Sequence, residues 1–385
     1  MQHRATLIPC SQLAGTSANG SEPYELDDFA SLRYELNDAK SMLDPIYAKY
    51  PVAWRKYQQF ADPFANFKRA LVNQYNTQCT TNAWLKFYEM NAHWKFIDNL
   101  QAAQPPLIFF NAELPGAAIC ATNHYCKTRG LAFDWVASSY VPQSTNTALG
   151  DIYGIYARNR SKWLMNERNN GDMTRVDNIY DIVSRIGGTV NLYTHDAGMS
   201  LGQAGKEDFE HQEQINMKLH LGTAIAGFAT LAPRGIFVAK QYTPFETLTW
   251  NLIILYAGMF DKFYMCKPIT SREYNSEIYL LGIGFRGFDA KVRALLIDKL
   301  ANFSESPLFP RDSLVNFEPQ INAIREFTRD AFGAQARAIR AMVAQYARGN
   351  YEAELTARNK EITREWLAKY PIKRLANSDK ILARS

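Results

Sequence analysis

The sequence predicts an α/β protein whose sheet is mostly parallel with an antiparallel last strand, flanked by helical N- and C-terminal extensions. Between residues 105 and 288, short apolar runs that suit buried strands alternate with helical patterns. Such alternation is typical of a parallel sheet covered on both faces by helices. Outside that stretch, apolar residues recur at three- and four-residue spacing, which indicates helices. We therefore divide the 385-residue chain into an N-terminal arm with a helical cap at residues 1–100, a core at 101–290 and a helical extension at 291–385.

The N-terminal part of the chain has two characters. Residues 1–22 are rich in Ser, Gly and Thr and show no evident signal peptide, so we expect a loose arm. Residues 25–100 follow a helical pattern, with apolar side chains such as Phe60, Phe64 and Phe67 at the matching spacing. We expect these helices to pack as a cap on a larger body.

The core is expected to contain six strands. They are predicted at residues 107–110, 130–140, 189–195, 235–240, 261–266 and 277–285. Helices are expected at 210–231 and 248–256 between them. The last two strands are joined by a short segment, which allows them to be antiparallel. The apolar run at 248–260 is too short to cross a bilayer and predicts a buried helix, and no membrane partner is expected.

The positive charge of the chain is concentrated towards its C-terminus. The formal net charge is +5 and the pI is near 8.8. Residues 321–385 contain thirteen Lys and Arg against seven Asp and Glu. The helices expected at 319–346 and 351–368 place most of these cations on one side of an apolar stripe. A solvated amphipathic face and a surface that attracts RNA phosphates both fit this pattern.

The cysteines indicate a reducing compartment. There are five, with no C-x-x-C pair, so neither a disulfide framework nor a zinc ribbon is indicated. Cys120, His124 and Cys126 lie close together, but no second ligand pair follows at zinc spacing. We expect buried structural thiols and no metal centre.

Three charged residues at the ends of apolar runs predict a site. They are Asp196, Lys240 and Glu277. The carboxyl ends of strands are where α/β sheets expose their chemistry, although ordinary ion pairs also lie there. Two lysines and two carboxylates together suit the deprotonation of a weak nucleophile such as a ribose hydroxyl, because desolvation and a second cation lower the pKa of the basic lysine. These residues supply three of the four groups.

Four blocks carry a resemblance to a known family. In chain order they read NNGDMTRVDNI, NLYTHDAG, GIFVAKQYTPF and KPITSREYNSEIYLL. Together they resemble the FtsJ/RrmJ-like superfamily of S-adenosylmethionine-dependent ribose 2′-O-methyltransferases. Within it they are most similar to the mRNA cap-1 methyltransferases of eukaryotes and large cytoplasmic DNA viruses. The resemblance implies a Rossmann-like methyltransferase sheet, S-adenosyl-L-methionine as cofactor and capped RNA as substrate.

The resemblance also implies the fourth charged residue. The family carries its first lysine on a helix before the first strand, and Lys86 in NAWLKFYEM matches that block better than Lys95 does. The implied tetrad is Lys86, Asp196, Lys240 and Glu277. In it, Lys240 takes the 2′-hydroxyl proton, Asp196 and Lys86 tune its pKa, and Glu277 holds its neighbours in register.

The cofactor turn departs from the family pattern. Where the superfamily commonly reads Asp-x-Gly-x-x-Pro-Gly-Gly, residues 110–117 read FNAELPGA, so Pro115 and Gly116 remain. Glu113 stands in for the missing carboxylate, and Asn111 or Glu113 is expected at the methionine part of the cofactor. The resemblance also assigns residues to the cofactor's other parts: for the ribose, Asp134 or Ser138 at the end of the second strand, and for the adenine, Asp172.

The expected RNA contacts lie in two places. A phosphate-and-stacking strip, in which basic residues alternate with Tyr156 and Trp163, is one reading of a segment that also fits a solvated loop. Its cations are Arg158, Arg160, Lys162 and Arg168. Arg272, beside Glu277, is expected to contact a phosphate or the cap.

Three functions remain open at this point. Cap-1 formation on mRNA is favoured, ribosomal or transfer RNA is the second substrate, and a non-catalytic RNA-binding or capping subunit is the third. Capping or transcription machinery is a further expected partner. The expected locations are the cytoplasm, including a viral factory or virion, and the nucleus.

Overall fold

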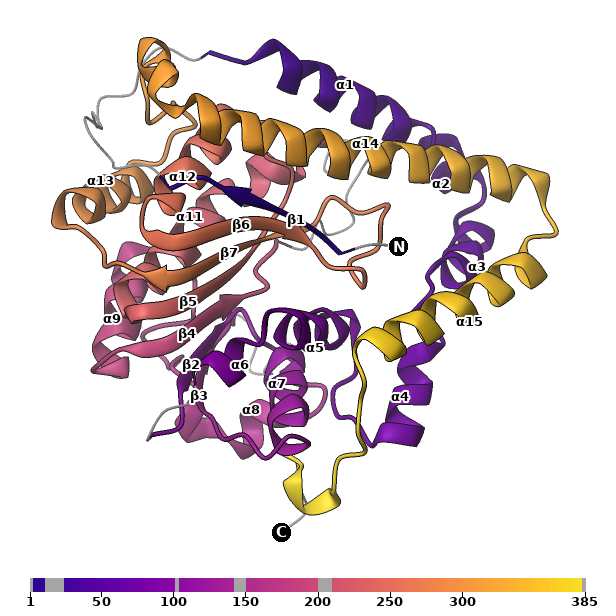
Figure 1. The fold of residues 1–385 in the computed structure, drawn as a ribbon, viewed down its shortest axis with the longest axis horizontal. Helices are drawn as coiled ribbons and strands as arrows, with labels where there is room; N and C mark the ends of the chain where they lie inside the picture. The colour runs from indigo at the N-terminus through magenta and orange to yellow at the C-terminus, as the bar shows by residue number, and fades with distance from the viewer. Residues whose placement is uncertain (1–2, 11–23, 101–103, 142–149, 200–209, 383–385) are drawn as a thin grey trace.

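A seven-stranded sheet lies at the centre of the protein. The computed structural model describes residues 3–10, 24–100, 104–141, 150–199 and 210–382. The strand order across the sheet is β1-β6-β7-β5-β4-β2-β3 (Figure 1). The strands are β1 (Arg4–Ile8), β2 (Leu107–Asn111), β3 (Asp134–Ser138), β4 (Val190–His195), β5 (Leu231–Gln241), β6 (Phe260–Lys267) and β7 (Ile278–Phe285).

The strand directions confirm the predicted sheet. β3, β2, β4 and β5 pair in parallel, whereas β7 is antiparallel to both β5 and β6. β6 therefore runs in the same direction as the parallel strands. The result is a mostly parallel α/β sheet with a reversed last strand.

β1 corrects the expectation of a loose N-terminal arm at Arg4–Ile8, whereas residues 11–22 of the arm lie outside the described residues. Its residues pair antiparallel with β6, from Arg4 opposite Lys267 to Ile8 opposite Phe263. Ile8 is buried in the core. The strand has only five residues, which is too short for its alternation to stand out in a sequence. Its backbone partners also come from the edge of β6, more than 250 residues away in sequence.

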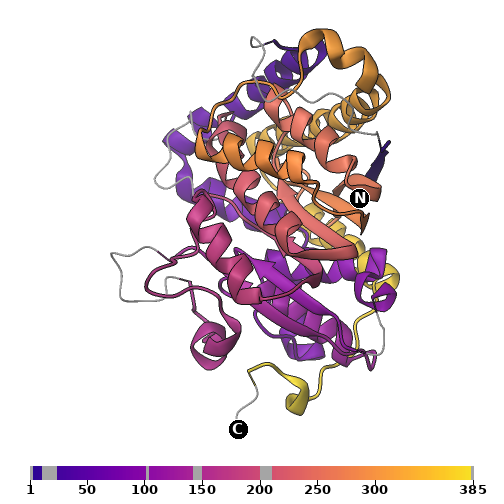
Figure 2. The same cartoon turned by 90° about the vertical axis from the view of Figure 1, so that its left-hand side faces the viewer.

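Helices cover both faces of the sheet, because alternate strand residues point to opposite sides. Ile108, Leu192 and Val238 pack with α5 (Asn82–Trp94), α6 (Phe96–Asn99) and α7 (Ala117–Lys127). Phe109, Tyr193 and Phe237 pack on the other side. The helices there are α9 (Val176–Ile186), α11 (Gln212–Thr230), α12 (Thr247–Ala257) and α13 (Ala290–Ala301). Figure 2 shows the α9 and α11 side of the molecule.

The two ends of the chain form a helical layer beside the sheet. The N-terminal helices are α1 (Asp27–Ser41), α2 (Asp44–Lys49), α3 (Pro51–Ala61) and α4 (Phe67–Tyr75). The C-terminal helices are α14 (Glu318–Arg348) and α15 (Glu352–Lys369). Figure 1 shows α14 lying along α1, and the two helices pack against each other. The remaining helices of the described residues are α8 (Ile155–Arg158), η1 (Arg160–Lys162), η2 (Arg311–Phe317) and η3 (Asn377–Asp379).

Part of the C-terminal positive charge is paired inside the molecule. Arg325 Nε lies 2.8 Å from Asp28 of α1, and an Arg340 guanidinium nitrogen lies 3.0 Å from Asp38 of the same helix. At these positions the cations join the two extensions rather than form a surface for phosphates.

The long apolar run is a core helix, as predicted. In α12 every residue after Thr247 is buried. Across the described ranges, no helix combines the length and apolar character that a bilayer span requires.

Candidate active site

Strands β5 and β7 bring the first two charged residues together. Lys240 of β5 lies directly opposite Tyr279 of β7. Because side chains alternate along a strand, Lys240 and Tyr242 share one face, and Glu277 shares that face with Tyr279. Tyr279 packs in the cluster that contains α5, so this face is the one α5 covers. Lys240 Nζ lies 3.7 Å from Glu277 Oε2.

Asp196 is added by the turn after β4. Lys240 Nζ donates to the Asp196 carbonyl at 3.1 Å and lies 3.5 Å from Asp196 Oδ1. The turn continues over the lysine at Gly198. A Cβ atom on Gly198 would lie 3.0 Å from Lys240 Nζ and 2.6 Å from the Tyr242 hydroxyl. A side chain here would therefore displace the amine from its carboxylate, which explains the glycine.

Lys86 of α5 completes the cluster. Thr81 caps the helix by accepting from Trp84 N at 3.4 Å. Lys86 Nζ then donates to Glu277 Oε1 at 2.7 Å and lies 3.5 Å from Asp196 Oδ2. Lys95, the alternative, is an exposed left-handed residue just after the helix. The structure thus brings Lys86, and not Lys95, to the other three.

The four charges alternate in a nearly closed box. Each lysine lies within 4 Å of both carboxylates. The exposed fractions of the side chains are low: 6% for Lys86, 10% for Lys240, 12% for Glu277 and 18% for Asp196. Two cations and two anions leave the box neutral. Burial keeps their mutual attraction strong, because little water is present to screen it.

The protonation of Lys240 differs from the expectation. Burial alone would lower the pKa of Lys240, but the Asp196 and Glu277 carboxylates outweigh burial and hold it above its ordinary value. Burial likewise opposes ionisation of Asp196 and Glu277, yet the lysines hold the pKa of both carboxyls below the ordinary range. Without substrate, Lys240 is therefore an ammonium group and not a ready base.

Two tyrosines that the sequence analysis did not single out also contact the cluster. The Tyr279 hydroxyl donates to Asp196 Oδ1 at 2.8 Å and lies 3.4 Å from Glu277 Oε1. The Lys240 amine lies 5.5 Å from the centre of the Tyr242 ring. Both tyrosines follow a tetrad residue by two positions. The period of two along a strand was thus the signal that would have found them.

Lys267, also not singled out, anchors the segment that carries Glu277. It ends β6, and its Nζ donates to Asn275 O at 2.8 Å, Asn275 Oδ1 at 3.0 Å and Glu277 O at 2.8 Å. Ser271 Oγ adds a hydrogen bond of 3.3 Å to Glu277 Oε1. Burial lowers the pKa of Lys267 to about 7, with the nearby Glu277 charge opposing that shift. These contacts close residues 268–277 into a fixed loop.

The turn after β2 keeps its backbone close to the helix that follows. Gly116 is the N-cap of α7. Asn111 is buried, and its amide donates to the Tyr193 hydroxyl at 2.9 Å. The Glu113 carboxylate points into the protein, where Oε1 accepts from Ile119 N of α7 at 3.0 Å. Burial raises the pKa of Glu113 to about 8. The Glu113 side chain thus stabilises the turn by connecting it to the backbone of α7.

Asp134 and Ser138, the two residues expected at the ribose of the cofactor, lie at opposite ends of β3. Asp134 begins β3 opposite Leu107, whereas Ser138 ends the strand opposite Asn111. Asp134 therefore lies at the amino edge of the sheet, away from the turn, where it forms an ion pair with Lys162. The structure therefore brings Ser138, and not Asp134, to the turn after β2, because Asp134 begins β3 instead of ending it.

Ser138 and Asp172 lie at the correct edge for a cofactor. The Ser138 hydroxyl is buried and has no hydrogen-bond partner within the described part of the chain, and the same holds for Thr194 near the end of β4. Asp172 follows Gly171, where a Cβ would lie 2.0 Å from the Ser139 carbonyl. The Asp172 loop is therefore pressed against the end of β3. Orphaned polar atoms and a close backbone approach fit a polar ligand such as S-adenosyl-L-methionine.

The expected RNA strip is only partly available. Arg158, Arg160 and Arg168 are exposed, and Arg160 lies 4.9 Å over the Tyr156 ring. Trp163 is only 6% exposed and packs edge-on to Trp135 and Tyr156, so it cannot stack on a base. Lys162 is paired with Asp134. Trp163 is therefore not available for stacking, whereas Tyr156 is partly exposed. The strip also lies along β3, an edge strand that β2, β4 and β5 separate from β7.

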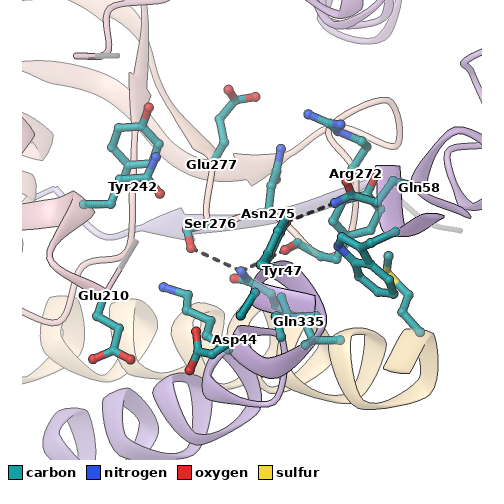
Figure 3. A pocket seen from close by; sticks show the side chains of 18 residues that line it. Asp44, Tyr47, Gln58, Glu210, Tyr242, Arg272, Asn275, Ser276, Glu277 and Gln335 are labelled. Atoms are coloured by element: carbon teal, nitrogen blue, oxygen red, sulfur yellow. Dashed lines mark hydrogen bonds between the residues drawn. The ribbon is translucent and has the colours of Figure 1, made fainter. Parts of the chain in front are cut away.

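Arg272 lines a cavity that opens beside the tetrad. The cavity has a volume of about 700 Å³, and Glu277, Tyr242 and Arg272 all line it (Figure 3). The Arg272 guanidinium lies 5.4 Å from the centre of the Tyr274 ring. Arg272 is therefore next to the site, as predicted from its place beside Glu277.

The cysteines and histidine of α7 belong to the core. All five cysteines are free thiols, and Cys120 and Cys126 are buried. His124 Nε2 donates to the Lys373 carbonyl at 2.8 Å, which ties α7 to the C-terminal segment.

A sheet of this strand order, with a glycine turn after its first parallel strand, defines a Rossmann-like methyltransferase fold. A sequence profile described as FtsJ-like methyltransferase matches residues 79–285. The match covers more than half of the chain, and the protein belongs to that family. FtsJ-like methyltransferases generally use S-adenosylmethionine.

Relatives occur in viruses and animals. The chain is 34% identical over 324 residues to "Probable methyltransferase EP424R" of African swine fever virus (strain Badajoz 1971 Vero-adapted), spanning 80% of this chain and 71% of the relative. It is 28% identical over 293 residues to "Cap-specific mRNA (nucleoside-2'-O-)-methyltransferase 2" of Mus musculus, spanning 72% of this chain and 37% of that protein. The Drosophila melanogaster protein of the same name is 25% identical over 333 residues, spanning 81% of this chain and 46% of its own length.

Proposed function

We propose that this methyltransferase transfers the methyl group of S-adenosyl-L-methionine to a ribose 2′-oxygen of RNA, forming cap-1 on the first transcribed nucleotide of capped mRNA. The observation that carries the proposal is the buried, neutral box of Lys86, Asp196, Lys240 and Glu277. It lies at the edge of the sheet where α/β proteins hold their ligands. The cap-specific activity printed in the names of the animal relatives supports the choice of RNA.

The proposed chemistry starts from a protonated Lys240. When bound, S-adenosyl-L-methionine supplies an activated methyl group on a positively charged sulfur. A further cation beside Lys240 lowers the pKa of its amine, since like charges disfavour the charged form. Lys240 would first release its proton to solvent; the neutral amine would then accept the 2′-hydroxyl proton as that oxygen bonds to the methyl carbon and the sulfur–methyl bond breaks. Lys240 would therefore act as the base only once the cationic cofactor is bound.

The other members orient Lys240 and keep the box neutral. Asp196 holds the amine through its carbonyl and Oδ1, while Lys86 and Tyr279 fix its carboxylate. Lys86 also fixes Glu277 at 2.7 Å. A fixed amine presents its lone pair to one position, and alignment of this kind contributes much of the rate.

The cofactor would lie between the turn after β2 and the end of β3. Pro115 and Gly116 form this turn ahead of α7, where Ile155 fills the space beside Gly116, and Asn111 lies beneath the same turn. Ser138 offers its unpartnered hydroxyl for the ribose, and Asp172 lies beside it for the adenine. The N-terminus of α7 adds backbone N–H groups.

One assay tests the proposal. Labelled S-adenosyl-L-methionine is incubated with cap-0 RNA or uncapped RNA, using the native protein, Lys240→Ala and the control Lys262→Ala, an exposed lysine of β6. We expect a 2′-O-methyl product on capped RNA only, absent with Lys240→Ala and retained with Lys262→Ala. Equal activity on uncapped RNA would indicate ribosomal or transfer RNA as substrate. An absence of cofactor binding by calorimetry would indicate a non-catalytic RNA-binding or capping subunit.

A further inference from the structure

One face of α11 lies against the turn that carries Asp196. Asn216, His220 and Thr223 follow one another at spacings of four and three residues, so their side chains share that face. All three are buried, with at most 7% of their surface exposed. Buried polar side chains need partners, because an unpaired polar group inside a protein is costly. Their partners include residues 195–199, at the end of β4 and in the turn.

Two histidines hold the backbone of Ala197, the residue that follows the tetrad aspartate. His195 Nδ1 accepts from Ala197 N at 3.3 Å, and His220 Nε2 donates to the Ala197 carbonyl at 3.3 Å. Asn216 Oδ1 adds a hydrogen bond of 2.7 Å from Met199 N. Helix α11 therefore holds the turn at two residues, directly through His220 and Asn216.

The hydrogen bonds assign one neutral form to His195. Thr223 Oγ1 donates its single proton to the His220 carbonyl at 2.9 Å, so it accepts from His195 Nε2 at 3.2 Å. The His195 proton is thus on Nε2, which leaves the lone pair of Nδ1 free for Ala197 N. A protonated imidazole has no such lone pair and could not accept from the amide.

The surroundings keep both imidazoles neutral. Burial lowers the pKa of His195 well below its ordinary value, and the neighbouring His220 and Lys240 act in the same direction. Burial, assisted by Lys240, also lowers the pKa of His220 to about 4, although the nearby Asp196 carboxylate opposes that shift. Both rings therefore keep their hydrogen-bonding roles at neutral pH.

The amide that His195 accepts from belongs to the same peptide group as the carbonyl that binds Lys240. That group joins Asp196 to Ala197, and the Asp196 carbonyl accepts from Lys240 Nζ at 3.1 Å. A trans peptide is planar, so its N–H and C=O point in opposite directions. His195 and Lys240 thus lie at the two ends of one rigid plane, and the orientation of that plane fixes where the amine lies.

His220 also supports the amine from a second side. Its ring stacks on Tyr242, with 5.5 Å between the ring centres and 25° between the planes. The Tyr242 ring in turn lies 5.5 Å from Lys240 Nζ. A shift of the His220 ring would therefore reach the amine through both the turn and the tyrosine.

We propose that His195 and His220 are positioning residues for methyl transfer, which fix the Asp196–Ala197 peptide group and through it the Lys240 amine. The inference rests on the proposed ribose methylation. The two histidines act through Asp196 and Lys240, so their loss should lower the rate and leave ligand binding nearly unchanged.

Paired substitutions at His195 separate positioning from packing. His195→Leu removes the acceptor for Ala197 N. His195→Asn keeps an acceptor, because an asparagine oxygen readily accepts from the backbone N–H two residues on. Both variants lose the contact with Thr223. We expect His195→Leu to lower kcat about 10- to 100-fold, with the KM values for capped RNA and S-adenosyl-L-methionine little changed, and His195→Asn to recover most of the rate.

The same comparison applies at His220. His220→Leu loses the donor to the Ala197 carbonyl, whereas the amide of His220→Gln can still donate. His124→Leu is the matched control, because this buried histidine also donates to a backbone carbonyl, that of Lys373 at 2.8 Å. It should lose stability without the selective fall in kcat. Equal kcat in the leucine variant and its conservative partner at both positions, or an equal fall in His124→Leu, overturns the inference.

Hydrogen exchange followed by mass spectrometry tests the same contacts without methyl transfer. We expect the Ala197 amide to exchange about tenfold faster in His195→Leu than in the native protein, and at close to the native rate in His195→Asn. Thr223→Val keeps the size of the side chain but removes the acceptor that fixes the His195 proton. It should accelerate the same amide, and it decides the question if the leucine variants do not fold.

The exchange result also separates the inference from the proposed reaction. Unchanged exchange of the Ala197 amide in these variants overturns the inference. If the amide responds as expected but the native protein forms no methyl product, the histidines still hold the turn and the proposed reaction fails.

Discussion

The Tyr279 hydroxyl donates a 2.8 Å hydrogen bond to Oδ1 of Asp196, joining β7 to the turn after β4. Burial raises the pKa of Tyr279 well above its ordinary value, so the phenol stays protonated and remains a donor. Asp196 Oδ1 also lies 3.5 Å from Lys240 Nζ. One carboxylate oxygen is thereby held between a neutral donor and a cation.

Removing that hydroxyl should slow methyl transfer. We expect Tyr279→Phe to lower kcat about 10- to 100-fold, because a hydrogen bond to a charged group contributes about 1.5–3 kcal/mol. The KM for cofactor should change little. Tyr256→Phe is the matched control, since that buried hydroxyl has no partner within the described residues. Equal loss in both variants would show a packing effect instead.

Lys267 should act on the rate through the position of Glu277. Lys267→Met removes three hydrogen bonds from the loop that ends at Glu277, and we expect kcat to fall about tenfold or more. The affinity for S-adenosyl-L-methionine, measured by calorimetry, should remain native. Lys262→Met changes an exposed lysine of the same strand and should have no effect. A parallel loss of cofactor affinity would argue for general unfolding of the site.

A methyl group at Gly171 should disturb the Asp172 loop. In Gly171→Ala the new Cβ would lie 2.0 Å from the Ser139 carbonyl, so the loop must move away from β3. We expect a loss of at least about tenfold in S-adenosyl-L-methionine affinity by calorimetry. Gly130→Ala has a similar positive φ of 70°, against 79° at Gly171, but nothing within 4 Å of its Cβ. Native affinity in both variants would remove Asp172 from the proposed cofactor contacts.

Glu113 should make stability depend on pH. Its folded pKa is raised from 4.5 to about 8, mainly by burial, so its stabilising contribution is full below pH 4.5 and is lost as pH rises towards 8. Glu113→Gln keeps an oxygen to accept from Ile119 N but cannot ionise. We expect the variant to gain stability over the native protein between pH 5 and pH 8, by up to about 1.4 kcal/mol per pH unit.

Urea unfolding at pH 5 and pH 8 measures this difference, with Glu361→Gln, an exposed residue of α15, as the control. A constant difference at both pH values would contradict the raised pKa. A large loss of cofactor affinity in Glu113→Gln would instead place its carboxylate against the ligand, as the sequence also allowed.

The strand ends explain why much of the site could be predicted. Asp196 follows β4 and Lys240 lies near the end of β5, so a parallel sheet collects them at one edge. Glu277 joins them because it precedes β7, which runs in the opposite direction. Lys86 required the family pattern, because no local rule says that a helical lysine will meet residues 110 and 191 positions away. The two-residue period of a strand also predicts Tyr279, because it follows Glu277 by two positions and shares its face.

Other features depend on distances that a sequence does not contain. The sign of the Lys240 pKa shift follows from two carboxylates within 4 Å, which outweigh burial. The position of Asp134 depends on which residue begins β3, because the first and last residues of a strand lie at opposite sides of the sheet. β1 forms only because β6 offers it an open edge.

The buried Glu89 carboxylate joins segments from the whole length of the chain. It lies on α5, one turn after Lys86. Its oxygens accept from Ile269 N at 2.8 Å, Thr270 N at 3.0 Å and Trp366 Nε1 at 3.1 Å, and His3 Nδ1 lies 2.9 Å away.

This junction has a consequence for biosynthesis. Trp366 leaves the ribosome 277 residues after Glu89, on the order of tens of seconds later at ordinary translation rates. Until then, the helix that carries Lys86 lacks one of its anchors. A nascent or prematurely terminated chain can therefore contain all four charged residues and still lack one of the contacts that hold the helix of Lys86 in place.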